Sequence, residues 1–153
     1  MRVASLMTTN VVCVGVHQSL NEAAHLMWQH DCGSLPVTNG EEKVVAMITD
    51  RDICIASYFQ GKPLREIPVS SAMSKQLFHC RASDDAAHVQ QLMQAHKIRR
   101  VPVLDAKFRA VGIITLNDLA RASTKRSITA TGIRDTLASI GTPPTVRSLM
   151  VVA

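Results

Sequence analysis

Aromatic residues are scarce in this chain of 153 residues, which contains one Trp, one Tyr and three Phe. This scarcity, together with the lack of a dense Arg/Lys stripe on any expected helix, argues against a nucleic acid partner although the net charge is +5. No apolar run approaches the roughly 20 residues of a membrane-spanning helix. The first residues, Met1–Ser5, also lack the apolar stretch of a secretion signal. We therefore expect a cytoplasmic protein with no membrane partner.

Paired cysteines and catalytic motifs are also missing. The four cysteines form no CxxC pair and are expected to be reduced, small residues of the core: Cys13, Cys32, Cys54 and Cys80. The histidines form no metal-binding set, because His25 and His30 lie five residues apart and do not share a helix face. No G-x-S-x-G, P-loop or H-E-x-x-H motif occurs. The sequence therefore predicts neither an enzyme nor a metal site, and no required cofactor.

The chain contains the same segment twice. Residues 3–56 align with residues 69–122 without a gap, at a constant offset of 66 residues. An internal repeat of this kind is a stronger indicator of fold than local propensity. Two copies of one unit pack most simply about a pseudo-two-fold axis, so sites near that axis come in pairs. The matching residues include Pro36-Val37 with Pro102-Val103, Ile48-Thr49 with Ile114-Thr115, and Asp52 with Asp118.

Each copy has the pattern of strand, helix, strand, strand and helix. In the first copy an S-x-x-E capping box at Ser19–Glu22 begins a helix that ends near Gly33, and Asn39-Gly40 indicates a tight turn. The expected elements are strand 11–16, helix 19–30, strands 35–38 and 44–48, and a helix from 49 to about 58. The second copy repeats them at 77–82, 85–96, 101–104, 110–114 and from 115 onward. A short lead-in segment with a methionine precedes each first strand, at residues 3–7 and 69–73.

This repeated unit resembles the CBS domain family, named after cystathionine β-synthase. The resemblance rests on the LPV and VPV strands, the lead-in segments, and the strand-Thr-x-x-Asp sequences at residues 49–52 and 115–118. It implies an α/β (α+β) fold in which two β-α-β-β-α repeats pack about a pseudo-two-fold axis. We expect repeat 1 at residues 1–66, repeat 2 at 67–124, and a C-terminal tail at 125–153. Such pairs bind adenosine nucleotides in the cleft between the repeats and associate side by side, which implies a homodimer.

The two Thr-x-x-Asp sequences have two interpretations. Thr49 and Thr115 suit the position that caps a helix, with Asp52 and Asp118 facing the free amides of the first turn. The alternative is nucleotide binding, because a carboxylate accepts hydrogen bonds from both ribose hydroxyls and a helix N-terminus offers amides to a phosphate. In the resembling family the Asp holds the ribose and the Thr lies beside the sugar-phosphate.

Other positions distinguish the two copies. The resembling family usually has Gly three residues before the Thr, as at Gly112, whereas Ala46 in copy one is expected to crowd the ligand. Arg99-Arg100 stands where that family often has basic residues reaching toward phosphate, and copy one has Gly33-Ser34 there. We therefore expect the Asp118 site to favour ATP or ADP and to carry more of the binding. Arg51 and Lys97 are secondary phosphate candidates. The nucleotide-binding residues that the resemblance implies are Thr49, Arg51, Asp52, Arg99, Arg100, Thr115, Asn117 and Asp118.

The tail departs from the repeat. Residues 131–140 place Ile133, Leu137 and Ile140 on one face of a short expected helix, which docks on the pair or on a neighbouring subunit. Residues 146–153 are apolar enough for a small strand.

The favoured hypothesis is a stand-alone regulatory CBS pair. It binds AMP, ADP, ATP or an NAD-like ligand in the inter-repeat cleft as a cytosolic energy or metabolite sensor, and acts on an unknown protein target. The alternative is a structural or interaction module whose clefts stay empty.

Overall fold

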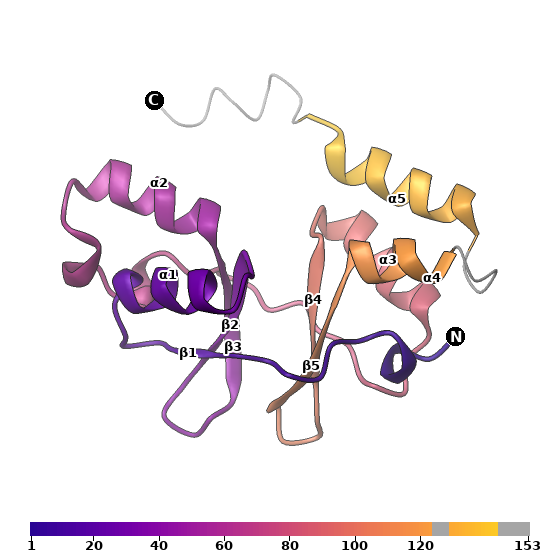
Figure 1. Cartoon of the computed structure of the whole chain (residues 1–153), viewed down its shortest axis with the longest axis horizontal. Coiled ribbons are helices and arrows are strands. Elements are labelled where there is room, and N and C mark those ends of the chain that lie inside the picture. Colours follow the sequence, from indigo (N-terminus) through magenta and orange to yellow (C-terminus); the bar gives the residue numbers. More distant parts are fainter. Residues whose placement is uncertain (124–128, 144–153) are drawn as a thin grey trace.

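A computed structural model describes residues 1–123 and 129–143, in which the two repeats lie side by side (Figure 1). Repeat 1 contains β1 (Val14–Gly15), α1 (Leu20–Gln29), β2 (Ser34–Thr38), β3 (Val44–Thr49) and α2 (Asp50–Gln60). Repeat 2 contains α3 (Ala86–His96), β4 (Arg100–Leu104), β5 (Ala110–Thr115) and α4 (Leu116–Ser123), and α5 (Ala130–Gly141) follows. Short 3-10 helices lie at Val3–Ser5, Leu64–Glu66 and Val69–Ser71. The expected mixed α and β fold with a helical tail is confirmed.

The first strand of each repeat is shorter than expected. Strand 11–16 is reduced to β1, which runs parallel to β2, and strand 77–82 is reduced to a single parallel bridge between Cys80 and Val103. The reason lies in the proline of the neighbouring strand. Leu104 N donates to Cys80 O, and Pro102, two residues earlier, faces the same edge but has no N–H to continue the pairing.

The lead-in segments cross between the repeats. Val3 N donates to Asp84 O at 2.8 Å, and the equivalent Val69 N donates to Gln18 O at 2.8 Å. Further hydrogen bonds recur at the 66-residue offset, Thr8 N to Ile113 O at 2.9 Å and Ser74 N to Met47 O at 2.8 Å. The pseudo-two-fold relation is therefore visible in individual hydrogen bonds, and each lead-in segment is held by the other repeat.

Each repeat has its own apolar core, completed by this exchange. Core 1 consists of Val14, Leu20, Ala23, Met27, Leu35, Val37, Ala46, Ile48, Ile53, Ile67 and Val69. Core 2 consists of Val3, Cys80, Ala86, Val89, Met93, Val101, Val103, Ile114, Leu116 and Leu119. Burial of a Val or Leu side chain contributes about 1.5–3 kcal/mol, so the crossing residues Val3 and Val69 tie the two repeats together.

The cysteines do not all belong to the cores. Cys80 is buried in core 2, where burial raises the pKa of its thiol to about 12. Cys13 and Cys32 are half-buried, but Cys54 is exposed on α2, so the expectation that all four are core residues is wrong. All four are free thiols.

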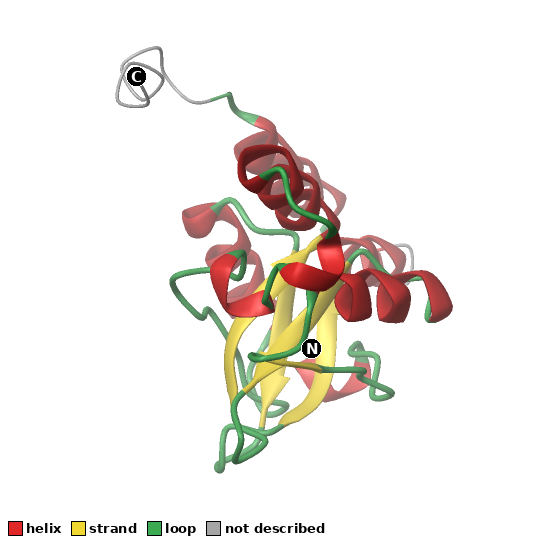
Figure 2. Cartoon of the chain, turned by 90° about the vertical axis from the view of Figure 1, so that its left-hand side faces the viewer, coloured by secondary structure: helices red, strands yellow, loops and turns green. Residues whose placement is uncertain are grey.

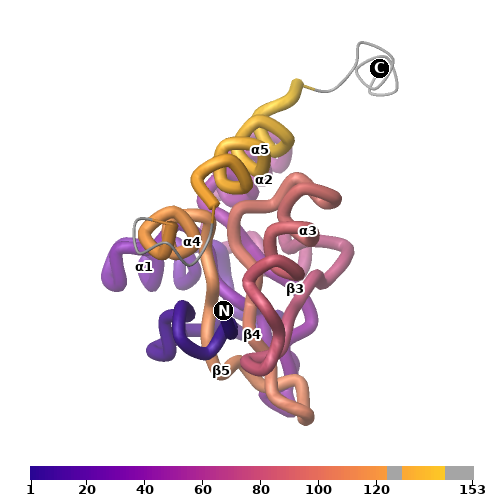
Figure 3. Tube along the Cα trace, turned by 90° about the vertical axis from the view of Figure 1, so that its right-hand side faces the viewer, coloured from indigo at the N-terminus to yellow at the C-terminus, as the bar shows by residue number. Residues whose placement is uncertain are grey.

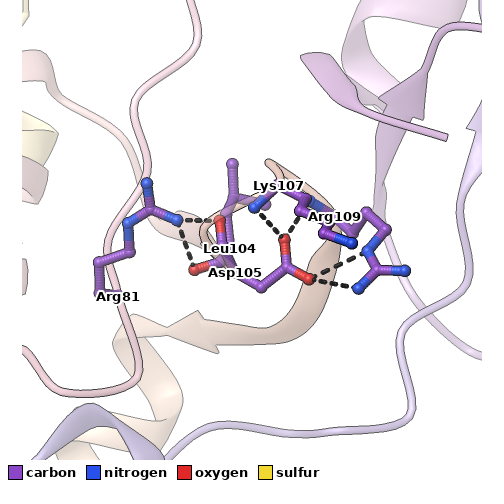
Figure 4. Close-up of polar contacts among 5 residues, drawn as sticks. All are labelled: Arg81, Leu104, Asp105, Lys107 and Arg109. Atoms are coloured by element: carbon purple, nitrogen blue, oxygen red, sulfur yellow. Dashed lines mark hydrogen bonds and ion pairs between the residues drawn. The ribbon is translucent and has the colours of Figure 1, made fainter. Parts of the chain in front are cut away.

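The two hairpin tips lie together at the end of the molecule opposite α2 and α5 (Figures 1 and 2). In repeat 2 the Asp105 carboxylate accepts hydrogen bonds from the backbone N–H groups of Lys107 and Arg109 and from the Arg109 guanidinium (Figure 4). Arg81 donates to the carbonyl oxygens of Leu104 and Asp105. In both hairpins the residue with a left-handed backbone is not a glycine: Glu42 has φ 59° and Phe108 has φ 62°.

Helix α5 docks on repeat 2 of its own chain, against α3 and α4 (Figures 1 and 3). Ile133 and Ile140 pack against core 2, and Gln94 Nε2 donates to the buried Thr136 Oγ1 at 2.8 Å. The docking face therefore includes Thr136 rather than the expected Leu137, whose side chain is 56% exposed. The strand expected at residues 146–153 lies outside the described residues.

Candidate functional site

Two cavities open at the seam between the repeats, and each is lined by residues of both. One has a volume of about 520 Å³ and the other of about 500 Å³. The first, called here the Thr115 cavity, includes Thr115, Asn117 and Gly33. The second, the Thr49 cavity, includes Thr49, Asp52 and Lys97. Ser34, Arg99 and Arg100 line both cavities, so the two sites adjoin.

The N-terminus of α2 opens onto the Thr49 cavity. Thr49 caps this helix, and its backbone N and Oγ1 donate to Asp52 Oδ2 at 2.8 and 2.6 Å, while Asp52 N donates to Thr49 Oγ1 at 3.2 Å. Arg51 and Asp50, both exposed, line the same cavity. The capping interpretation of this Thr-x-x-Asp sequence is therefore confirmed, and the half-buried Asp52 carboxylate also borders open space.

The same reciprocal bonds occur at the start of α4. Thr115 N and Oγ1 donate to Asp118 Oδ2 at 2.8 and 2.6 Å. Asp118 differs from Asp52 in two respects: its side chain is only 5% exposed, and Oδ1 forms an ion pair with Arg121. Asp118 is not among the residues that line the Thr115 cavity, whereas Thr115 and Asn117 are. Its position supports a role in holding Thr115.

The basic residues are not divided between the sites as expected. Arg99 and Arg100 line both cavities, so they do not belong to the Asp118 site alone. The secondary candidates Lys97 and Arg51 both line the Thr49 cavity. Within residues 1–123 and 129–143, neither the Arg99 nor the Arg100 guanidinium has a hydrogen-bond or ion-pair partner. The Thr49 cavity therefore has the larger number of cationic groups.

The exchange of Gly112 for Ala46 does not act on the ligand space as expected. Ala46 is fully buried in core 1, and neither residue is among those lining the two cavities. A Cβ added at Gly112 would lie 2.5 Å from Met7 Sδ and 3.2 Å from Thr8 O. The glycine is therefore needed where the lead-in segment passes over β5, and the difference between the repeats concerns packing.

Several lining residues were missed by the sequence analysis. Helix α1 ends at Gln29, and the left-handed backbone expected at Gly33 occurs instead at Asp31, which has a φ of 48° and lines the Thr115 cavity. Its equivalent Lys97 has φ 53°, so both repeats turn at this position, although neither residue is a glycine that would have indicated it in the sequence. From α5, Leu137 lines the Thr115 cavity and Ile140 the Thr49 cavity, a contribution that no repeat alignment contains.

The chemistry available at both cavities is recognition of polar and anionic groups. Helix N-terminal amides, hydroxyls and guanidinium groups bind phosphate and sugar oxygens. In the described ranges, no three His, Cys, Asp or Glu residues are grouped so as to hold a metal ion. No helix of the described residues has the length and apolarity to cross a membrane.

Comparison with known proteins identifies the family. The family model described as CBS domain matches residues 3–58 and 65–125. The chain belongs to the CBS domain family. It is 41% identical over 119 residues to the CBS domain-containing protein YhcV of Bacillus subtilis, covering 77% of this chain and 82% of YhcV. It is 34% identical over 116 residues to Hypoxic response protein 1 of Mycobacterium tuberculosis, covering 76% of this chain and 80% of that protein.

A solved structure extends the comparison to ligands. The CBS domain pair of protein MJ0100, in complex with 5′-methylthioadenosine and S-adenosyl-L-methionine, matches with a TM-score of 0.72 at 27% identity. The match covers 80% of this chain and 98% of that chain. A CBS pair similar to this one thus holds adenosine-containing molecules.

Proposed function

We propose that this CBS pair binds adenosine-containing ligands in the Thr49 and Thr115 cavities and acts as a regulatory module. The observation that carries the proposal is that helix N-termini meet the guanidinium groups of Arg99 and Arg100 at two adjoining cavities, and that these guanidinium groups have no hydrogen-bond or ion-pair partner among the described residues. Volumes of about 500 Å³ lie within the usual range of small-molecule sites. The adenosine ligands of the MJ0100 pair support the same ligand class.

The residues have distinct roles in this proposal. Asp52 accepts the ribose hydroxyls through Oδ1, because Oδ2 is already bonded to Thr49. Arg99 and Arg100 bind phosphate, with Arg51 as a further cation at the Thr49 cavity. In the other cavity Thr115 and Asn117 contact the ligand, and Asp118 positions Thr115.

A thermal-shift panel of AMP, ADP, ATP, NAD and S-adenosylmethionine tests this function. Ligand at about 100-fold over Kd adds about 2.7 kcal/mol to the free energy of unfolding, which for a chain of this size raises Tm by roughly 5–10 °C. Guanosine and cytidine nucleotides serve as controls for general anion effects. If no adenosine compound at millimolar concentration raises Tm above these controls, the proposed function is wrong.

The sensor role has its own test. A cytoplasmic energy sensor must bind AMP and ATP competitively at one site with different consequences for the protein, because a ligand shifts conformations only by its differential affinity. Isothermal titration of ATP into AMP-saturated protein measures the competition. Additive heats without displacement would contradict the sensor role while leaving ligand binding intact.

An interaction surface is the second candidate, favoured by exposed apolar residues of α1 and α2. Trp28 and Tyr58 are each 81% exposed, Phe59 is 75% and Ile55 is 44% exposed. Repeat 2 has Gln94 at the position of Trp28, and α5 covers it there. We propose that a second copy of the chain covers this face of repeat 1, which gives a homodimer with closed two-fold symmetry.

The variant Trp28→Gln tests this surface, because it gives repeat 1 the residue that repeat 2 carries. The parent protein should have the mass of a dimer by light scattering at micromolar concentration, and the variant should dissociate at least tenfold more readily, since buried Trp residues often dominate interfaces. Gln29→Ala on the same helix is the matched control. A monomeric parent, with and without ATP, would contradict the homodimer.

A further inference from the structure

The two cavities share their principal phosphate-binding groups. Arg99 and Arg100 lie at the start of β4, where the seam separates the cavities, and line both. A Cβ added at Gly33 would lie 3.1 Å from Arg100 Nη2, which places this guanidinium directly over the equivalent strand start of repeat 1. The corresponding residues of repeat 1, Gly33 and Ser34, supply no second pair of cations.

The charges that are not shared differ between the cavities. The Thr49 cavity keeps two cations of its own, Lys97 and Arg51, beside Asp50 and Asp52. Apart from the shared arginines and His30, the only ionisable lining groups of the Thr115 cavity are Asp31 and Cys32 within the described ranges. Lys97 Nζ donates to the neutral carbonyl of Thr142 at 3.2 Å, so its charge is not cancelled there.

We propose that the two sites compete for Arg99 and Arg100. This inference rests on the proposed function and adds its regulation: a phosphorylated adenosine compound occupies the Thr49 cavity and draws the guanidinium groups toward its phosphates. The Thr115 cavity is then left with the Asp31 carboxylate, and accepts an uncharged or cationic adenosine compound. The protein thus reads two different adenosine ligands at once.

The physical basis is the geometry of phosphate recognition. A guanidinium that binds phosphate in a bidentate manner is fixed in one orientation, so it cannot serve an anion in the adjoining cavity. A second phosphate would also lie near the first and beside Asp31, and like charges repel in a partly desolvated cleft. Two sites coupled in this way affect each other reciprocally, commonly by 5–150-fold in affinity.

Isoleucine δ1-methyl NMR of the full chain resolves the two sites. Ile98 and Ile140 line the Thr49 cavity and Ile113 lines the Thr115 cavity. In an ADP titration, the Ile98 and Ile140 signals should shift first, and Ile113 should respond with a midpoint about tenfold higher. With ADP present at saturation of the Thr49 cavity, adenosine should then shift Ile113 with an affinity within about twofold of its value without ADP.

Two variants test whether Asp31 and the shared arginines determine the order in which ADP fills the cavities. Asp31→Lys copies the residue of repeat 2, which adopts the same left-handed backbone at Lys97, and should bring the two ADP midpoints within about threefold. Arg99→Ala with Arg100→Ala should weaken ADP at both cavities and leave adenosine within about twofold. Arg65→Ala, at an exposed arginine that lines neither cavity, is the control for lost charge.

The outcomes distinguish this inference from the proposed function. Equal ADP midpoints for all three methyl signals in the parent protein, or an Asp31→Lys variant that keeps the tenfold gap, would overturn the competition while adenosine binding stands. If neither adenosine nor ADP shifts any of the three signals at millimolar concentration, the proposed function fails and this inference fails with it.

Discussion

Repeat 1 and repeat 2 share a backbone but differ where the cavities lie. The hydrogen bonds of the lead-in segments recur at the 66-residue offset. The carboxylates of Asp52 and Asp118, at the starts of α2 and α4, accept the same bonds from their threonines. The cavity positions differ: Asp31 stands against Lys97, and Gly33-Ser34 against Arg99-Arg100. The buried positions keep their apolar character because a close-packed core tolerates little change. The cavity positions lack that constraint, and the difference in their charge is the basis for the ligand difference that we propose.

The outer faces of the repeats differ as well. Helix α5 packs on α3 and α4, whereas Trp28 and Tyr58 on repeat 1 remain exposed. Helix α5 also lines both cavities, because it contributes Leu137 to one and Ile140 to the other. Helix α5 therefore connects repeat 2 to both cavities, and the uncovered face of repeat 1 is the surface that we propose a second copy of the chain covers.

The largest expected effect is on stability, and it distinguishes Asp118 from Asp52. Asp118→Ala should lower the free energy of unfolding by about 3 kcal/mol, because it leaves the Thr115 amide and hydroxyl without their buried acceptor. Asp52→Ala should cost about 1 kcal/mol through the lost cap. Urea denaturation of both variants measures the difference.

Ligand affinity should show the reverse order. The sequence favoured Asp118 as the stronger ligand residue, but its burial and its pairing with Arg121 lead us to predict the larger loss for Asp52→Ala, about a hundredfold from two lost charge-assisted bonds. Asp52→Asn, which keeps one acceptor, is the control for the lost charge. Titration calorimetry that finds equal adenosine affinity in Asp52→Ala and the parent would contradict the ribose assignment.

A smaller effect is expected where the repeats exchange glycine for alanine. Gly112→Ala should destabilise by about 1–3 kcal/mol through overpacking against Met7 and the Thr8 carbonyl. Ala46→Gly should cost about 1–2 kcal/mol, through backbone freedom and the loss of one buried methyl group. A double variant with Met7→Ala should recover part of the Gly112→Ala loss. Additive losses in this cycle, measured by urea denaturation, would mean that Met7 is not the obstacle.

The repeat, the order of elements and both Thr-x-x-Asp caps could be predicted from the sequence, because each depends on patterns within one unit. To predict the short first strands, one would need to know which edge of the sheet Pro102 faces. That edge depends on the register of β4, which the sequence does not give. The sharing of Arg99 and Arg100 between cavities depends on how the repeats pack, and a pairwise alignment assigns each residue to one repeat. The cavity contributions of α5 lie outside the repeat altogether.

The smallest expected effect concerns pH, at the equivalent positions Cys13 and His79. Burial, aided by the nearby Arg81 charge, lowers the pKa of His79, and its Nδ1 is buried without a hydrogen-bond partner among the described residues. The unfolded chain therefore binds a proton more readily than the folded one. The contribution of neutral His79 to stability is present above the ordinary histidine pKa of about 6.5 and is lost as the pH falls through the lowered value. Burial raises the pKa of the Cys13 thiol, which stays neutral throughout this range.

His79→Cys gives repeat 2 the residue of repeat 1 and should flatten the pH dependence of stability. The urea midpoint of the parent should decrease as the pH is lowered from about 7.5 to about 5.5, and that of the variant should decrease less. His17→Cys, at an exposed histidine, controls for the loss of one imidazole. This control leaves the surroundings of His79 unchanged, so it should keep the parent's slope. If both variants flatten the curve equally, the environment of His79 is not the source of the acid sensitivity.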